Sequence, residues 1–192
     1  MTMTTDAERL APREPEFNET KAGTEAALDA ALARELKLGS AFLHWLVSRT
    51  RFADEEVDEI VLLRTNNPWG KAKLRVWNGD EQRYESIVRE GETDLLLVLK
   101  SRRRGRFALH IENKLANGSF TPLQPEVYRA RAAAWMGNKS YGDYEEWETI
   151  LIAPTAFHAR NSYGCSKFDR YIPHEDIAAH IPEFASNLPS PN

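Results

Sequence analysis

The sequence predicts a mixed α/β sandwich, and a few stretches of the chain carry that prediction. Two strongly apolar runs, at 94–100 and 106–114, are separated by a short polar segment with a glycine, which is typical of a β-hairpin. An amphipathic helical pattern follows at 123–135, with apolar side chains recurring every three or four residues. A further apolar run at 148–153 predicts another strand. Helices and strands in this order are expected to pack as helical layers on a β-sheet.

The chain before the hairpin is predicted to begin with two helices. Thr24 can cap a first helix, in which alanine and leucine recur at helical spacing. The segment Leu38-Gly39-Ser40 supplies a stop and then a cap for a second helix. A strand is predicted at 57–63, and the turn-rich segment 66–70 ends it. The stretch 74–88 mixes strand-like and charged residues and predicts no single element.

The remaining elements complete one domain. A short strand is predicted at 168–172, and a final helix is predicted from about Pro173. Residues 1–18 are polar, contain proline and lack periodicity, so we expect a disordered tail there. Residues 187–192 are expected to fray in the same way. The folded domain is therefore expected to span 19–186.

Composition excludes several classes of protein. The 192 residues are enough for a substantial core, and the formal net charge of -4 gives no overall attraction to nucleic acid. Cys165 is the one cysteine, which excludes an internal disulfide and a cysteine zinc site. No apolar run is long enough for a membrane span, so we expect no membrane association. A single cysteine suits a reducing compartment, so we expect a cytoplasmic location.

The predicted hairpin brings two carboxylates together. Pairing of Lys100 with Arg106 sets an antiparallel register. In that register Asp94 lies opposite Glu112, with Cβ atoms ~5 Å apart, and Lys114 shares their face because side chains alternate along a strand. Facing carboxylates repel unless they share a proton, a cation or water, and Mg²⁺ binds well to a few carboxylate oxygens plus water. The pattern therefore predicts a divalent-metal site, although surface strands also produce an Asp followed by Glu-x-Lys by chance.

Three segments together resemble the core of the PD-(D/E)XK nuclease superfamily. They are Glu92-Thr93-Asp94, Ile111-Glu112-Asn113-Lys114 and, in the helix that follows, Gln124 with Tyr128. Within the superfamily they are most similar to a bacterial group with an Ile-Glu-Asn-Lys strand and a Gln…Tyr helix. The resemblance covers 24–181, and Thr93 replaces the proline of the nominal motif. It implies a restriction-endonuclease-like α/β/α sandwich, with a central mixed β-sheet flanked by helices.

The resemblance implies a role for each residue of the motif. Asp94 and Glu112 would bind Mg²⁺ or Mn²⁺, aided by the backbone carbonyl of Asn113. Lys114 would orient or deprotonate the attacking water, or else stabilise the transition state. Gln124 would position water or a backbone phosphate from the next helix.

Four residues outside this motif are further candidates for binding the metal ion or the nucleic acid. Glu25 lies near the position of the fold's helical glutamate and would be an outer metal ligand, although the helix dipole also accounts for a glutamate there. Arg129 and Arg131 follow Gln124 in its helix and would meet a phosphate backbone if that helix borders the cleft. Arg103 lies at the hairpin tip, about 20 Å from the site, where it would grip a distal phosphate or simply be solvated.

The expected function is hydrolysis of phosphodiester bonds by a metal-dependent nuclease, acting on DNA in preference to RNA. Specificity would come from loops or from a homodimer. A basic and aromatic stretch at 69–84 could stack bases, and a half-exposed strand explains it equally well. His110 could line the site or be a core histidine of the sheet. Two rival interpretations are an inactive module that kept the fold and binds nucleic acid or protein, and an unrelated α/β interaction protein.

Overall fold

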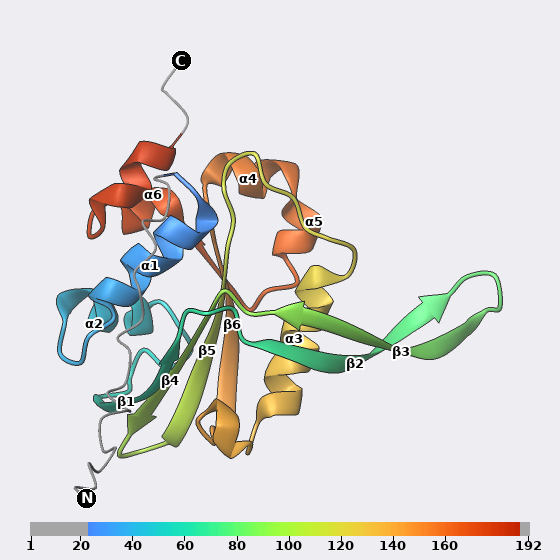
Figure 1. Ribbon diagram of the computed structural model, residues 1–192, viewed down its shortest axis with the longest axis horizontal. Coiled ribbons are helices and arrows are strands. Elements are labelled where there is room, and N and C mark those ends of the chain that lie inside the picture. The colour runs from blue at the N-terminus through green and yellow to red at the C-terminus, as the bar shows by residue number, and fades with distance from the viewer. Residues whose placement is uncertain (1–22, 189–192) are drawn as a thin grey trace, which may run out of the picture.

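The computed structural model describes residues 23–188 (Figure 1), so the tail predicted at 1–18 and most of the predicted frayed end lie outside the described residues. The helices are α1 (Glu25–Glu35), α2 (Ala41–Ser48), α3 (Gln124–Trp135), α4 (Thr155–Arg160), α5 (Ser162–Cys165) and α6 (His174–Ile177), with short 3-10 helices at Lys139–Tyr141 and Pro182–Asn187. The strands are β1 (Val57–Arg64), β2 (Trp69–Asn78), β3 (Arg83–Glu92), β4 (Leu95–Ser101), β5 (Gly105–Asn113), β6 (Glu146–Ala153) and β7 (Arg170–Pro173). None of the helices in this range has the length and apolarity needed to cross a membrane.

Five strands form one mixed sheet in the order β1-β4-β5-β6-β7. The first three strands pair antiparallel, whereas β5, β6 and β7 pair parallel. Helices α1, α2 and α6 lie on one side of this sheet and α3 lies on the other (Figure 1). The predicted α/β class is therefore confirmed, with a mixed sheet between helices.

Strands β4 and β5 are buried on both faces, which explains why their sequences are almost continuously apolar. On one face, Leu97 and Leu109 belong to the large core beneath α1 and α2. On the other face, Leu96 and Ala108 pack with Trp135 of α3. The β4–β5 hairpin is thus at the centre of the domain. The residues at its open end, opposite the turn, are attached to two tightly packed strands.

The predicted helix starts are confirmed. The hydroxyl of Thr24 accepts a hydrogen bond of 3.2 Å from the backbone N–H of Ala27, and Ser40 accepts one of 3.1 Å from Leu43. Each cap satisfies a backbone donor that a helix start leaves without a partner.

Elsewhere the structure differs from the prediction or adds elements to it. The segment 66–70 is not all turn, because β2 begins at Trp69. The stretch 74–88 forms most of an antiparallel β2–β3 hairpin, which projects from the body (Figure 1). Helices α4 and α5 were not predicted. The last helix, α6, has only four residues, because the chain turns so that Ile181 and Phe184 reach the core.

Candidate metal site at the end of the β4–β5 hairpin

The predicted hairpin register is confirmed from Lys100 opposite Arg106 to Leu96 opposite His110. The ladder ends at the pair Leu95 and Ile111, so the predicted pairing of Asp94 with Glu112 is not part of it. The Oδ2 of Asp94 accepts a hydrogen bond of 2.8 Å from the backbone N–H of Asn113. This bond holds the Asp94 carboxylate against the strand that carries Glu112.

Glu112 is the most enclosed carboxylate of the site, with its side chain only 1% exposed. One oxygen, Oε1, lies 2.6 Å from the Lys114 ammonium and accepts a hydrogen bond of 2.6 Å from the Gln124 amide. The other, Oε2, is buried and makes no hydrogen bond of normal geometry among the described residues. The Tyr128 hydroxyl nevertheless interacts with the Glu112 carboxylate and favours its charged form, which partly offsets the increase in its pKa that burial causes. Tyr128, one helical turn after Gln124, accepts a hydrogen bond of 3.0 Å from the backbone N–H of Asp94. Both α3 residues of the motif therefore contact the hairpin carboxylates or their backbone.

Helix α1, which lies on the other side of the sheet from α3, adds two more carboxylates (Figure 1). Glu25 accepts a hydrogen bond of 3.2 Å from the backbone N–H of Leu115, and its other oxygen lies 3.8 Å from the Lys114 ammonium. Asp29 is buried, and it accepts a hydrogen bond of 3.0 Å from the side-chain amide of Asn113. The structure thus brings Glu25 to the site, as predicted, and adds Asp29 beside it.

The side chain of Asn113 points away from the two motif carboxylates. Its amide nitrogen bonds Asp29, and its carbonyl oxygen lies 2.9 Å from Nε2 of buried His174. Because that oxygen only accepts, Nε2 must carry the proton. Only the backbone carbonyl of Asn113 is left for the metal-binding role predicted for this residue. Asp29 and His174 are site residues that the sequence prediction missed; the four-residue spacing of Glu25 and Asp29, one helical turn, was the available signal.

Negative charge exceeds positive charge at this end of the hairpin. Burial, together with the charges of Glu112 and Asp29, raises the pKa of Asp94 well above its ordinary value. Burial likewise raises the pKa of Glu112 despite Lys114, and it raises that of Asp29 to about 7. Although burial opposes the charged form of Lys114, the carboxylates around it raise its pKa. One ammonium group therefore faces several carboxylates.

These residues fit a hard divalent cation only if water and substrate complete its coordination. In the part of the chain that the structure describes, no group of three Asp, Glu, His or Cys side chains is arranged to hold a metal ion by itself. Mg²⁺ commonly uses one or two carboxylates plus water and phosphate oxygens. Asp94 and Oε2 of Glu112 would supply that donor set, and a cation there would relieve the excess negative charge.

The arginines predicted to contact nucleic acid from α3 are both held by other groups of the fold. Arg131 is completely buried, donating hydrogen bonds to the Thr93 hydroxyl at 3.0 Å and to the backbone carbonyl of Glu92. It therefore has no exposed surface for a phosphate backbone in this structure, and the expected contact stays a prediction. Arg129 forms an ion pair with Asp169 beside β6 and β7.

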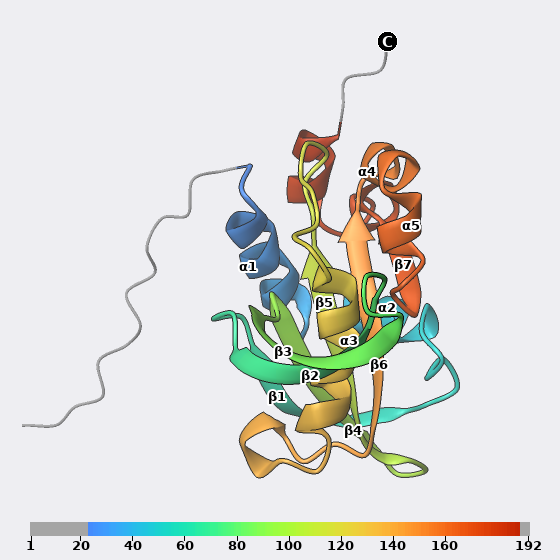
Figure 2. The same ribbon diagram turned by 90° about the vertical axis from the view of Figure 1, so that its right-hand side faces the viewer.

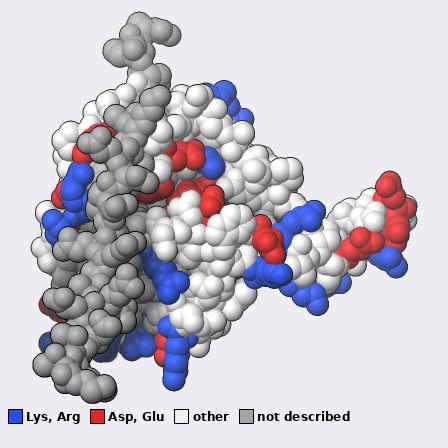
Figure 3. All heavy atoms as spheres, in the orientation of Figure 1, with Lys and Arg blue, Asp and Glu red and all other residues white. Residues whose placement is uncertain are grey.

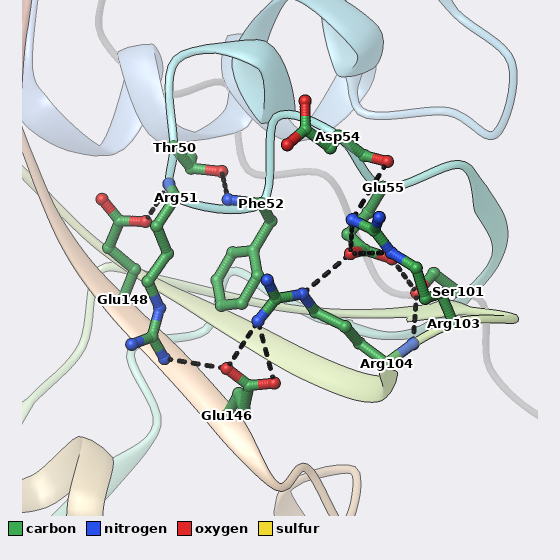
Figure 4. A network of polar contacts seen from close by, with 10 residues as sticks. All are labelled: Thr50, Arg51, Phe52, Asp54, Glu55, Ser101, Arg103, Arg104, Glu146 and Glu148. Carbon is green, nitrogen blue, oxygen red and sulfur yellow. Dashed lines mark hydrogen bonds and ion pairs between the residues drawn. The ribbon is translucent and has the colours of Figure 1, made fainter.

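Arg103 and His110 both have structural partners. Arg103 forms an ion pair of 2.6 Å with Glu55, within a network that also includes Arg104 (Figure 4). His110 is fully buried 3.0 Å from the Tyr144 hydroxyl, and burial lowers its pKa to about 3. His110 is thus a neutral core histidine, which was one of the two alternatives for this residue.

Comparison of the chain with protein-family models, with curated proteins and with solved structures found no match in any of the three.

Proposed function

We propose that this chain is a divalent-metal-dependent nuclease of the PD-(D/E)XK type, which hydrolyses phosphodiester bonds in DNA in preference to RNA. One observation carries the proposal. The buried Glu112 has one oxygen held by Lys114 and Gln124, while its other oxygen makes no hydrogen bond of normal geometry among the described residues, and its charge helps to raise the pKa of Asp94. A mixed sheet flanked by helices supports the finer proposal of a restriction-endonuclease-like fold.

Asp94 and Glu112 would hold the ion, with Glu25 and the backbone carbonyl of Asn113 at its periphery. A bound Mg²⁺ or Mn²⁺ ion supplies Lewis-acid chemistry, lowering the pKa of water and neutralising charge on phosphate oxygens. No covalent enzyme intermediate is needed for this reaction class.

Lys114 has the position of a charge-stabilising residue. Its ammonium lies 2.6 Å from Glu112, and the surrounding carboxylates raise its pKa, so it stays protonated. A protonated lysine cannot accept a proton from water. Of the roles considered for Lys114, this favours stabilisation of negative charge that develops in the transition state.

Gln124 is placed to orient the Glu112 carboxylate. Its amide holds Oε1 of Glu112, and its own carbonyl oxygen accepts a hydrogen bond of 3.0 Å from the backbone N–H of Thr121. The amide orientation is therefore determined from both ends, which leaves Oε2 of Glu112 as the oxygen directed to a ligand.

The test is cleavage of plasmid, linear duplex and single-stranded DNA, and of RNA, in Mg²⁺ or Mn²⁺. Lys114→Ala should lower the metal-dependent rate at least about 100-fold, as expected for loss of a transition-state contact. Lys100→Ala is the matched control, because Lys100 lies on the same hairpin and is 48% exposed at its other end.

A folded wild-type chain that cleaves none of these substrates would contradict the proposal and favour the inactive binding module. Equal activity of Lys114→Ala and Lys100→Ala would also contradict it, because the cleavage would then come from elsewhere on the chain or from a contaminant.

A further inference from the structure

The β2–β3 hairpin forms an arm that is docked on the body by one face. Ala72 and Leu74 on its inner face are buried with Val127 of α3. At the root of the arm, a Cβ on Gly70 would lie only 2.4 Å from the ring of Trp135, so strand and helix are in close contact there. Figure 2 shows the ribbon crossing α3. The inner face is thus used for packing, whereas the outer-face residues of β2 remain exposed among residues 23–188.

The outer face of the arm carries aromatic and basic side chains in alternation with the inner residues. On β2 these outer-face residues are Trp69, Lys71, Lys73, Arg75 and Trp77, and on β3 the register places Tyr84, Ser86, Val88, Glu90 and Glu92 opposite them. From Trp69 to Trp77 the strand extends ~26 Å at ~3.3 Å per residue. The face is therefore long enough to contact several units of a linear ligand.

The aromatic rings of this face are more exposed than the stability of the hairpin requires. Trp77 and Tyr84 pack edge to face with centroids 5.2 Å apart, which stabilises the outer part of the arm. The two residues nevertheless remain 56% and 57% exposed, and Trp69, far from this pair at the root, is 62% exposed. A single exposed ring is ordinary, whereas a row of large apolar side chains on one projecting face indicates a binding surface.

Two of the basic side chains have no carboxylate partner. Lys71 forms an ion pair of 3.0 Å with Glu90, but among residues 23–188 neither Lys73 nor Arg75 has an ion pair. The Arg75 guanidinium lies 4.8 Å from the centre of the Tyr84 ring. Acidic side chains gather instead toward the far end of the arm (Figure 3). The cations between the rings are therefore available to an anionic ligand.

We propose that the outer face of the arm binds a single strand of nucleic acid, with bases stacked on Trp69, Trp77 and Tyr84 and phosphates beside Lys73 and Arg75. Aromatic rings interleaved with unpaired cations match the alternation of base and phosphate in a strand. A duplex is a poorer ligand, because its bases already stack on one another and do not offer their faces.

The root of the arm leads toward the candidate metal site. Trp69 lines a hollow of about 230 Å³ whose walls include Gln124, Tyr128 and Arg131, together with the acidic Glu90 and Glu92. Those two residues contact Glu112 and the backbone of Asp94. A strand that stacks on Trp69 is thereby led to the residues that surround the carboxylates.

This inference rests on the proposed function for its choice of nucleic acid as ligand, but binding can be tested apart from cleavage. Fluorescence anisotropy would follow the full chain binding a labelled oligodeoxythymidylate, and a duplex of the same length, in EDTA. Tyr84→Ala should weaken binding to the single strand about tenfold, through loss of one stacked base. Tyr163→Ala is the matched control, because this tyrosine is 76% exposed on α5, away from the arm.

A second pair of variants tests the charges. Arg75→Gln should reduce the slope of log affinity against log salt by about 0.7, the value for one lost phosphate contact on a single strand. Arg102→Gln removes a cation that is 91% exposed at the β4–β5 tip and should leave the slope unchanged.

Three outcomes would overturn the inference: wild-type affinity in folded Tyr84→Ala, tighter binding of duplex than of single strand, or self-association through the arm with no nucleic-acid binding. The proposed function fails separately. If the arm binds the strand but no metal-dependent cleavage occurs, the inference stands and the nuclease does not. If cleavage occurs and Tyr84→Ala binds as wild type does, the reverse holds.

Discussion

The two ends of the β4–β5 hairpin each lie beside a buried carboxylate, and only one of the two is fully neutralised. Near the tip, Glu55 is 1% exposed and contacts the guanidinium groups of Arg103 and Arg104 at 2.6 and 2.7 Å (Figure 4). At the open end, Glu112 is equally enclosed but contacts one cation, Lys114. The fold therefore supplies two cations to Glu55 but only one to Glu112, which also lies near other carboxylates.

The electrostatic consequences have opposite signs. Hydrogen bonds from Arg103 and Ser101 lower the pKa of Glu55 to about 2. Burial and the neighbouring Glu112 raise the pKa of Asp94 well above its ordinary value. A structural carboxylate is thus neutralised by the chain itself, whereas a carboxylate left short of positive charge is a candidate for binding a ligand cation.

The largest expected effect is on activity. Glu112→Gln keeps the shape of the side chain but removes the charge, so it should lower metal-dependent cleavage by about 100-fold or more. Glu55→Gln should leave the rate within about twofold, because its network has no contact with the site, and should instead lower Tm by a few degrees through loss of the arginine contacts. Cleavage assays and thermal melts on both variants make the comparison.

The opposite results would contradict the assignment of Glu112 to metal binding and of Glu55 to stability. If Glu55→Gln loses activity at a temperature where it is fully folded, the tip network belongs to the site. If Glu112→Gln is active but unstable, Glu112 is a structural carboxylate.

The next effect is on metal-dependent stability. A cation that binds only the folded chain contributes about 2.7 kcal/mol at 100 times its Kd, which corresponds to an increase in Tm of about 5–10 °C. Glu112→Ala should lose this increase, whereas Lys114→Ala and Glu55→Gln should retain it. Scanning calorimetry with Mg²⁺ and with EDTA measures the difference. An equal increase in Glu112→Ala would place the ion elsewhere.

A smaller effect is on the pH dependence of stability without metal. The pKa of Asp29 rises from 3.8 to about 7 on folding, so between these values the folded chain retains a proton that the unfolded chain has lost. Its contribution to stability is therefore present below pH 3.8 and is lost as pH rises through 7, with a slope of at most about 1.4 kcal/mol per pH unit. Glu55 acts in the opposite sense, since its lowered pKa adds stability above pH 4.5 that is lost as pH falls through 2.

Urea unfolding in EDTA, measured across this pH range, tests whether the free energy of unfolding falls as pH rises. Asp29→Asn should flatten the decline between pH 4 and 7, because asparagine does not titrate. An unchanged slope in Asp29→Asn would mean that another buried carboxylate carries the dependence.

Most of the hairpin could be predicted from the sequence because its information is local. Alternation along each strand determines which side chains share a face, and two apolar faces prevent a one-residue slip. The register from Lys100 and Arg106 onward followed from that pattern alone. The approach of Asp29 to Asn113 could not be predicted in the same way, because it depends on how α1 packs across 84 residues of sequence separation.

Arg131 and the arm show two further reasons why sequence patterns fall short. The charge of Arg131 predicts an exposed side chain. Its burial is stabilised instead by hydrogen bonds to the Glu92 carbonyl and the Thr93 hydroxyl and by contact with the Tyr128 ring. In β2 the alternation was present, yet the charged outer residues concealed it, because the inner face packs on only one helix.

The smallest expected effect concerns Arg103, which the sequence alone suggested as a contact to a distal phosphate. Its ion pair with Glu55 satisfies the guanidinium within the fold. Arg103→Gln should therefore change cleavage and single-strand affinity by less than about twofold, as surface ion pairs outside a binding face contribute little. The same assays that compare Arg75→Gln with Arg102→Gln can include this variant. A reduced salt slope in Arg103→Gln would mean that this arginine leaves Glu55 for a phosphate, and that the tip of the β4–β5 hairpin also takes part in binding.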